Sequence, residues 1–110
     1  MSEAAETPTQ TSPTLTQAAG ERAELSKFGG QDVVLDCRGE IAYLGRLVAV
    51  GDWFLELADA DVHDMDSSRT SKEIYVMEAA KHGIKKNRYS VHVRKSEVVS
   101  ISLLLDVIQY

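Results

Sequence analysis

Runs rich in β-forming apolar residues, some of them alternating with polar residues, dominate the middle of the chain and predict β-strands. The first run covers residues 32–37, a longer one covers 41–50, and a third covers 53–58. Runs of this length, separated by glycine-containing turn signals, are typical of short strands. Gly45 lies in the middle of the second run, where a glycine usually marks a bulge or a sharp bend.

Two segments have helical spacing instead. A short helix is expected over 21–28, before a pair of glycines. A second helix is expected over 70–82, because Thr70 as N-cap and Glu73 three residues later form a capping box. Gly83 follows as a C-terminal stop signal.

The strand pattern resumes after the second helix, with alternation over 89–93, a turn at 95–96 and a last core strand over 97–101. An apolar segment, 103–108, is expected to extend or cap the sheet. The order is therefore three strands, an inserted helix and two more strands. Together with the glycine bend, this order predicts a mainly β fold, a small, strongly bent five-stranded barrel with an N-terminal helix and an inserted helix.

The first twenty residues differ from the rest in composition. They contain five threonines and both prolines of the chain, and few apolar residues. Such a segment buries too little surface to offset the entropy lost on ordering. We therefore divide the chain into a disordered Thr/Pro-rich tail, 1–20, and a barrel domain, 21–110, with the helical insertion at about 70–83 and a C-terminal extension over 102–110.

Composition and charge narrow the class of protein. No apolar run approaches the roughly 20 residues that span a bilayer, and the first residues do not have the pattern of a secretory signal. The single Cys37 excludes a disulfide framework and a cysteine-based zinc site, which favours a cytoplasmic protein. A net charge of −5 argues mildly against nucleic-acid binding, although a local patch can outweigh it.

A basic stretch interrupts the acidic chain. Six lysines and arginines follow Ala79, with no acidic residue before Ser96. One interpretation is a phosphate-binding surface with Tyr89 as a stacking partner; the other is a solvated helix end and strand edge, where lysines discourage pairing. The six residues are Lys81, Lys85, Lys86, Arg88, Arg94 and Lys95.

An acidic segment, 59–66, allows three interpretations: a solvated loop, a metal site, or a partner for the basic stretch of a neighbouring subunit. The spacing, glycine and terminal glutamate of a calcium-binding loop are absent, so no metal is expected. Cys37 falls inside a predicted strand, and the three histidines have no metal-ligand spacing. We therefore expect no catalytic residue, no cofactor and no enzyme activity.

Two groups of residues follow one another along the chain. The second group is the segment 93–101, and the first consists of Val33, Val34, Leu35, Gly39, Tyr43, Gly45, Leu47, Asp52, Phe54, Leu55 and Leu57. In order and spacing, these groups resemble the two motifs of the Sm/LSm family, whose fold is shared by the bacterial RNA chaperone Hfq. The resemblance covers about 25–101, with the inserted helix in the variable loop, and implies a barrel of the SH3-like or Sm-like kind.

Two positions depart from the family pattern: Glu56 replaces an asparagine, and Lys95 replaces a glycine. In the family, that asparagine, an arginine and an aromatic residue form a pocket for one base per subunit. A glutamate at neutral pH only accepts hydrogen bonds, and it repels phosphate. Alternatively, Glu56 could pair with Arg94 and close the pocket.

The resemblance implies a non-catalytic protein that binds single-stranded RNA and assembles into a homo-oligomeric ring, with the last strand of one subunit against the fourth strand of the next. An alternative is an Sm-fold scaffold that has lost base recognition and binds a protein through its inserted helix. The implied RNA-binding residues are Asp52, Phe54, Glu56, Arg94 and Lys95 in the base-binding loops, and Lys85, Lys86 and Arg88 on phosphates.

Overall fold

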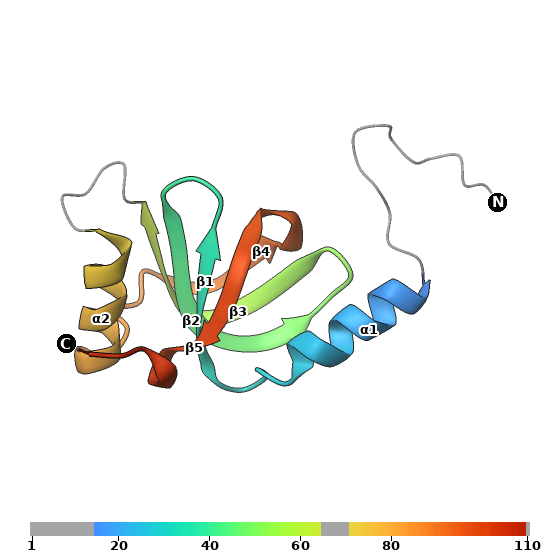
Figure 1. Ribbon diagram of the computed structural model, residues 1–110, viewed down its shortest axis with the longest axis horizontal. Coiled ribbons are helices and arrows are strands. Elements are labelled where there is room, and N and C mark those ends of the chain that lie inside the picture. The colour runs from blue at the N-terminus through green and yellow to red at the C-terminus, as the bar shows by residue number, and fades with distance from the viewer. Residues whose placement is uncertain (1–14, 65–70, 110) are drawn as a thin grey trace.

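The computed structural model describes residues 15–64 and 71–109, which form five strands and two helices (Figure 1). The strands make one antiparallel sheet in the order β4-β3-β2-β1-β5, which confirms the predicted mainly β class. In chain order the elements are α1 (Leu15–Ser26), β1 (Asp32–Cys37), β2 (Ile41–Val50), β3 (Phe54–Asp64), α2 (Lys72–His82), β4 (Arg88–Arg94), the 3-10 turn η3 (Lys95–Glu97), β5 (Val98–Leu103) and the 3-10 turn η4 (Leu104–Asp106).

Strands β2 and β3 form the long central hairpin, and their pairing is irregular at two points. The register shifts between Leu44 and Arg46 and again between Leu47 and Ala49. Gly45 lies at the first shift, where a side chain would meet the backbone of β3. Such irregularities increase the local bend and twist of a hairpin, so the glycine bend expected from the sequence coincides with a real break in the ladder.

Two apolar clusters lie on opposite faces of β1. Val33, Leu35 and Cys37 face the main core together with residues of β2, β3 and β4. Val34 faces a smaller cluster that contains Ala79 of α2 and residues of β2 and η4. Because β1 is covered on both sides, four of its six residues are buried, as is usual for strands between two layers.

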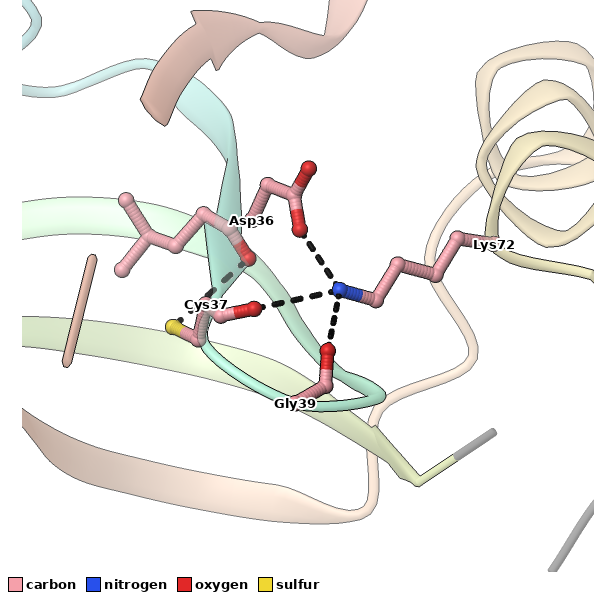
Figure 2. A network of polar contacts seen from close by, with 5 residues as sticks. Asp36, Cys37, Gly39 and Lys72 are labelled. Atoms are coloured by element: carbon pink, nitrogen blue, oxygen red, sulfur yellow. Dashed lines mark hydrogen bonds and ion pairs between the residues drawn. The ribbon is translucent and has the colours of Figure 1, made fainter. Parts of the chain in front are cut away.

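Helix α2 is attached to the sheet at its first turn. The Ser71 hydroxyl accepts a hydrogen bond from the backbone N–H of Ile74 and caps the helix. Lys72 Nζ then reaches the β1–β2 turn, where it lies 2.6 Å from Asp36 Oδ1 and donates to the carbonyls of Cys37 and Gly39 (Figure 2). The ammonium group thus joins α2 to the turn through three acceptors.

The ends of several elements differ from the sequence-based expectation. Helix α1 begins at Leu15 rather than at residue 21, so residues 15–20, which we assigned to a disordered tail, are helical. Residues 1–14 lie outside the described part of the chain. Leu25 and the following Phe28 pack on the main core and hold the C-terminal end of the helix, and a helix that has formed extends easily because each added residue contributes a hydrogen bond.

Strand β3 continues to Asp64, through most of the segment expected to be an acidic loop. The reason is that its carboxylates have partners: Asp59 pairs with Arg46 and Lys86, and Asp61 is buried. Asp66 and Thr70 lie outside the described residues, and the N-cap of α2 is Ser71 rather than the predicted Thr70. The apolar segment 103–108 caps the sheet, since Leu104 of η4 is buried against it. Neither helix of the described part is long and apolar enough to cross a membrane.

Candidate functional site

Pairing of β3 with β4 assembles an exposed group of side chains on the outer face of the sheet. In the register, Phe54 lies opposite Arg94, and Glu56 lies opposite His92. Alternation of the strand directs the intervening residues Leu55 and Leu57 into the core. We call Phe54, Glu56, Ser90, His92 and Arg94 the outer-face cluster.

The centre of the outer-face cluster is an aromatic ring beneath a cation. Phe54 is 40% exposed, and the guanidinium carbon of Arg94 lies 5.7 Å from its ring centroid, within the range of a cation–π contact. His92 meets the same ring edge-on, with centroids 6.3 Å apart. Such an arrangement offers a planar ligand a stacking surface and an adjacent positive charge.

The carboxylate of Glu56 has neutral or weakly basic partners. Ser90 Oγ donates to Glu56 Oε2 over 3.3 Å, and His92 Nε2 lies 3.7 Å from Oε1. The pairing therefore differs from the Glu56–Arg94 pair considered above, because the guanidinium of Arg94 lies over Phe54 instead. Glu56 does not withdraw Arg94 from the surface.

Two other predicted site residues are held by α1. Lys95 Nζ lies 3.0 Å from Glu21 Oε1, and the Lys95 side chain is only 11% exposed. Asp52 forms an ion pair with Arg22. Helix α1 consequently lies against the β2–β3 and β4–β5 turns, at the end of the molecule opposite α2 (Figure 1).

An open groove of about 810 Å³ runs between α1 and these turns. Trp53 is exposed and lines this groove. The carbonyl of Trp53 accepts a hydrogen bond from the backbone N–H of Lys95 over 2.8 Å, which fixes the two turns to each other.

The remaining predicted residues lie at the other end of β4. Lys85 and Lys86 precede the strand and Arg88 begins it, whereas Arg94 ends it. Arg88 and Arg94 are six residue steps apart along the strand, a distance of about 20 Å. Lys86 is paired with Asp59 over 3.3 Å and its Nζ lies 5.3 Å from the Tyr89 ring centroid. The structure thus divides the predicted RNA-binding residues into two groups.

Two carboxylates of the acidic segment, Asp59 and Asp61, contact other residues of the same chain. Asp61 accepts hydrogen bonds from the Tyr75 hydroxyl and from Asn87 Nδ2, the latter over 2.9 Å. Hydrogen bonds from Lys86 and Arg46 lower the pKa of Asp59 below its ordinary value. Among residues 15–64 and 71–109, no group of three or more histidine, cysteine, aspartate or glutamate side chains is arranged to hold a metal ion.

Four residues that contact the predicted site residues were not predicted from the sequence. These are Glu21 and Arg22 of α1, which pair with Lys95 and Asp52, and Ser90 and His92 of β4, which contact Glu56. The alternation of β4 offered a signal for the last two, since residues 90, 92 and 94 share one face. No sequence signal connects Glu21 to Lys95, which are far apart in the chain.

Comparison with solved structures agrees with this architecture. The Sm protein of Pyrococcus abyssii, solved in complex with a uridine heptamer, superposes with a TM-score of 0.50 at 18% identity, covering 74% of this chain and 93% of the other. The fold is therefore Sm-like. No family model matches the sequence, and no match is found among curated proteins.

Two further structures are similar at slightly lower scores. An Sm-like protein of Archaeoglobus fulgidus gives a TM-score of 0.49 at 16% identity, covering 86% of this chain and 99% of the other. A chain of the NatC complex bound to CoA gives 0.47 at 22% identity, covering 72% and 82%.

Proposed function

We propose that this chain is a non-catalytic, Sm-fold protein that binds single-stranded RNA at the outer-face cluster. The observation that carries the proposal is the exposed Phe54 ring with Arg94 above it at the end of the β3–β4 pair. Stacking of a base on an aromatic side chain contributes roughly 1–3 kcal/mol. Arg94 would supply charge to an adjoining phosphate. The uridine heptamer bound by the Pyrococcus protein of similar fold supports this proposal.

The other predicted residues take secondary roles in the proposal. Asp52 and Lys95 hold α1 beside the site through their ion pairs with Arg22 and Glu21. Lys85, Lys86 and Arg88 lie too far along β4 to contact the same nucleotide, and we assign them to phosphates further along the strand. The free, buried thiol of Cys37 is typical of a reducing compartment, and we propose that the protein acts in the cytoplasm.

We also propose that the chain assembles into a ring. Strands β4 and β5 are the two edges of the described sheet. Each edge carries a large exposed side chain, Tyr89 at 85% and Val99 at 67% exposure. Unpaired edges are templates for pairing with another chain, and joining β5 of one copy to β4 of the next would cover both. Light scattering of the purified protein tests this; a mass of six or seven subunits supports a ring, and a monomer contradicts it.

RNA binding is tested by fluorescence-anisotropy titration with oligo-U and oligo-A at low and high salt. We expect binding at low salt that weakens as salt rises, because phosphate contacts release counterions. Arg94→Ala should weaken binding about tenfold per contacted site, since a phosphate contact and part of the stacking platform are lost.

Lys27→Ala is the matched control, because it also removes one positive charge but lies outside the cluster and is paired with Glu24. It should leave the affinity nearly unchanged. If a folded assembly binds neither of these oligonucleotides nor a guanine-containing strand at low salt, RNA binding is wrong.

A second candidate function, a protein-binding scaffold, is favoured by a groove of about 380 Å³ beside α2. Apolar side chains of β1, α2 and the C-terminal segment line it, among them Val34, Val76 and Val107. Arg94→Ala discriminates between the candidates, since a scaffold that binds through α2 keeps its partner when Arg94 is removed, whereas an RNA-binding protein loses affinity for RNA.

A further inference from the structure

The carboxylate of Glu56 stands at the edge of the proposed base-stacking surface. Phe54 and Glu56 share the outer face of β3, two residues or about 7 Å apart along the strand. A base stacked on Phe54 therefore presents one of its edges to Glu56. The carboxylate is within reach of a ligand, because the Glu56 side chain is 36% exposed.

Glu56 keeps acceptor capacity in the folded chain. Its contacts are the Ser90 hydroxyl on one oxygen and, at 3.7 Å, the His92 imidazole on the other. An ionised carboxylate has about four acceptor positions and no donor. These two neighbours hold the carboxylate in place on the β3–β4 surface and leave acceptor positions on both oxygens.

We infer that Glu56 makes this site selective for guanine, an inference that rests on the proposed RNA-binding function. The Watson–Crick edge of guanine presents two adjacent donors, N1–H and the N2 amino group, which match the two oxygens of a carboxylate. Adenine and cytosine present one amino donor beside an acceptor nitrogen. Uracil presents one N–H between two carbonyl oxygens, which the carboxylate repels. Single-stranded RNA is read on such exposed base edges.

The test uses eight-nucleotide adenine strands that carry guanine, inosine or adenine at alternate positions, titrated by fluorescence anisotropy into the full-length protein at low salt. Inosine retains N1–H of guanine but lacks the N2 amino group, so it isolates the second hydrogen bond. We expect the guanine strand to bind roughly tenfold more tightly than the adenine strand, with the inosine strand between them, since a bidentate base contact discriminates by this order.

Glu56→Gln is the test variant, because it keeps the shape of the side chain and removes the charge. It should bind the three strands with similar affinity and gain affinity for the adenine strand, since one source of phosphate repulsion is removed. Glu73→Gln, an exposed position on α2, is the matched control and should keep the guanine preference.

The outcomes separate the two proposals. Equal binding of the three strands by the wild-type protein overturns guanine selectivity and leaves RNA binding intact. A guanine preference that persists in Glu56→Gln overturns the assignment to Glu56. If no strand binds, the proposed function is wrong and the inference fails with it.

Discussion

At Gly45 the backbone of β2 passes so close to β3 that a side chain would crowd its neighbours. A Cβ there would lie 3.1 Å from both the Ala58 carbonyl oxygen and the Ala60 Cβ. We therefore expect Gly45→Val to lower the free energy of unfolding by about 1–3 kcal/mol, the usual range for overpacking. Urea denaturation measures this change.

Gly20 provides the contrasting glycine, because a Cβ there meets nothing within 4 Å and the residue lies within α1. Gly20→Ala should raise the free energy of unfolding by about 0.5–1 kcal/mol, since alanine is favoured over glycine inside a helix. A Gly45→Val protein as stable as the wild type would show that β2 and β3 do not approach each other in this way.

Cys37 is a second residue whose side chain affects stability, through the pKa of its thiol. Burial, together with the nearby charge of Asp36, raises the pKa of its thiol from 9.0 to about 11. The folded state therefore holds this proton more tightly than the unfolded state. The stability that this provides is present below about pH 9 and is lost as the pH rises towards 11.

We expect iodoacetamide to modify Cys37 far more slowly in the folded protein at pH 8 than in urea, because only the thiolate reacts. Cys37→Ala should lessen the fall in unfolding free energy between pH 9 and 11 without abolishing it. The raised pKa values of Tyr43 and Tyr75 act in the same direction above pH 10. Rapid alkylation of the native thiol at pH 8 would contradict this account.

At the scale of elements, the attachment of α2 depends on Lys72. Its ammonium group has three oxygen acceptors on the β1–β2 turn, and its side chain is only 22% exposed. Lys72→Met retains most of the aliphatic stem but removes these contacts. We expect it to lower the free energy of unfolding by about 1–3 kcal/mol and to speed amide hydrogen exchange within α2.

Lys81→Met is the matched control, since Lys81 is exposed in the last turn of the same helix. It should change stability by less than about 0.5 kcal/mol. Equal effects of the two substitutions would mean that the Lys72 contacts do not hold α2 on the sheet.

At the scale of the whole molecule, the two exposed sheet edges are the places where two copies of the chain could pair. Tyr89→Lys places a charge on β4, at the edge where a neighbouring β5 is proposed to pair, and charges on edges oppose such pairing. We expect the mass measured by light scattering to fall towards that of a single chain. Val48→Lys places the same charge on the central strand β2, at another exposed apolar position, and should leave the assembly intact.

An unchanged assembly in Tyr89→Lys, or disassembly in both variants, would contradict pairing through β4. The same variants separate assembly from RNA binding. In a ring the outer-face clusters act together through multivalency, so loss of the ring should weaken the binding of long strands more than that of short ones.

Much of the fold could be predicted from local pattern. The bounds of β1 and β2 match the alternation of the sequence, because the apolar positions of these strands face a core. The ends of α1 and β3 could not be predicted in this way. Leu25 holds one end of α1 on the core, from which the helix continues over residues that have no apolar pattern. The carboxylates of Asp59 and Asp61 enter a strand because Arg46, Lys86, Tyr75 and Asn87 contact them.

The sequence by itself predicted a bent, mainly β fold and a site that contains both Phe54 and Arg94, which the structure brings together across β3 and β4. Alternation and motif order are local properties, so they can be recognised in the sequence alone. Only the tertiary structure determined which partner each charged side chain contacts. Glu56 meets Ser90 across 34 residues, and Lys95 meets Glu21 across 74. Such pairs depend on strand register and helix packing, which are fixed by burial of the core rather than by neighbours in sequence.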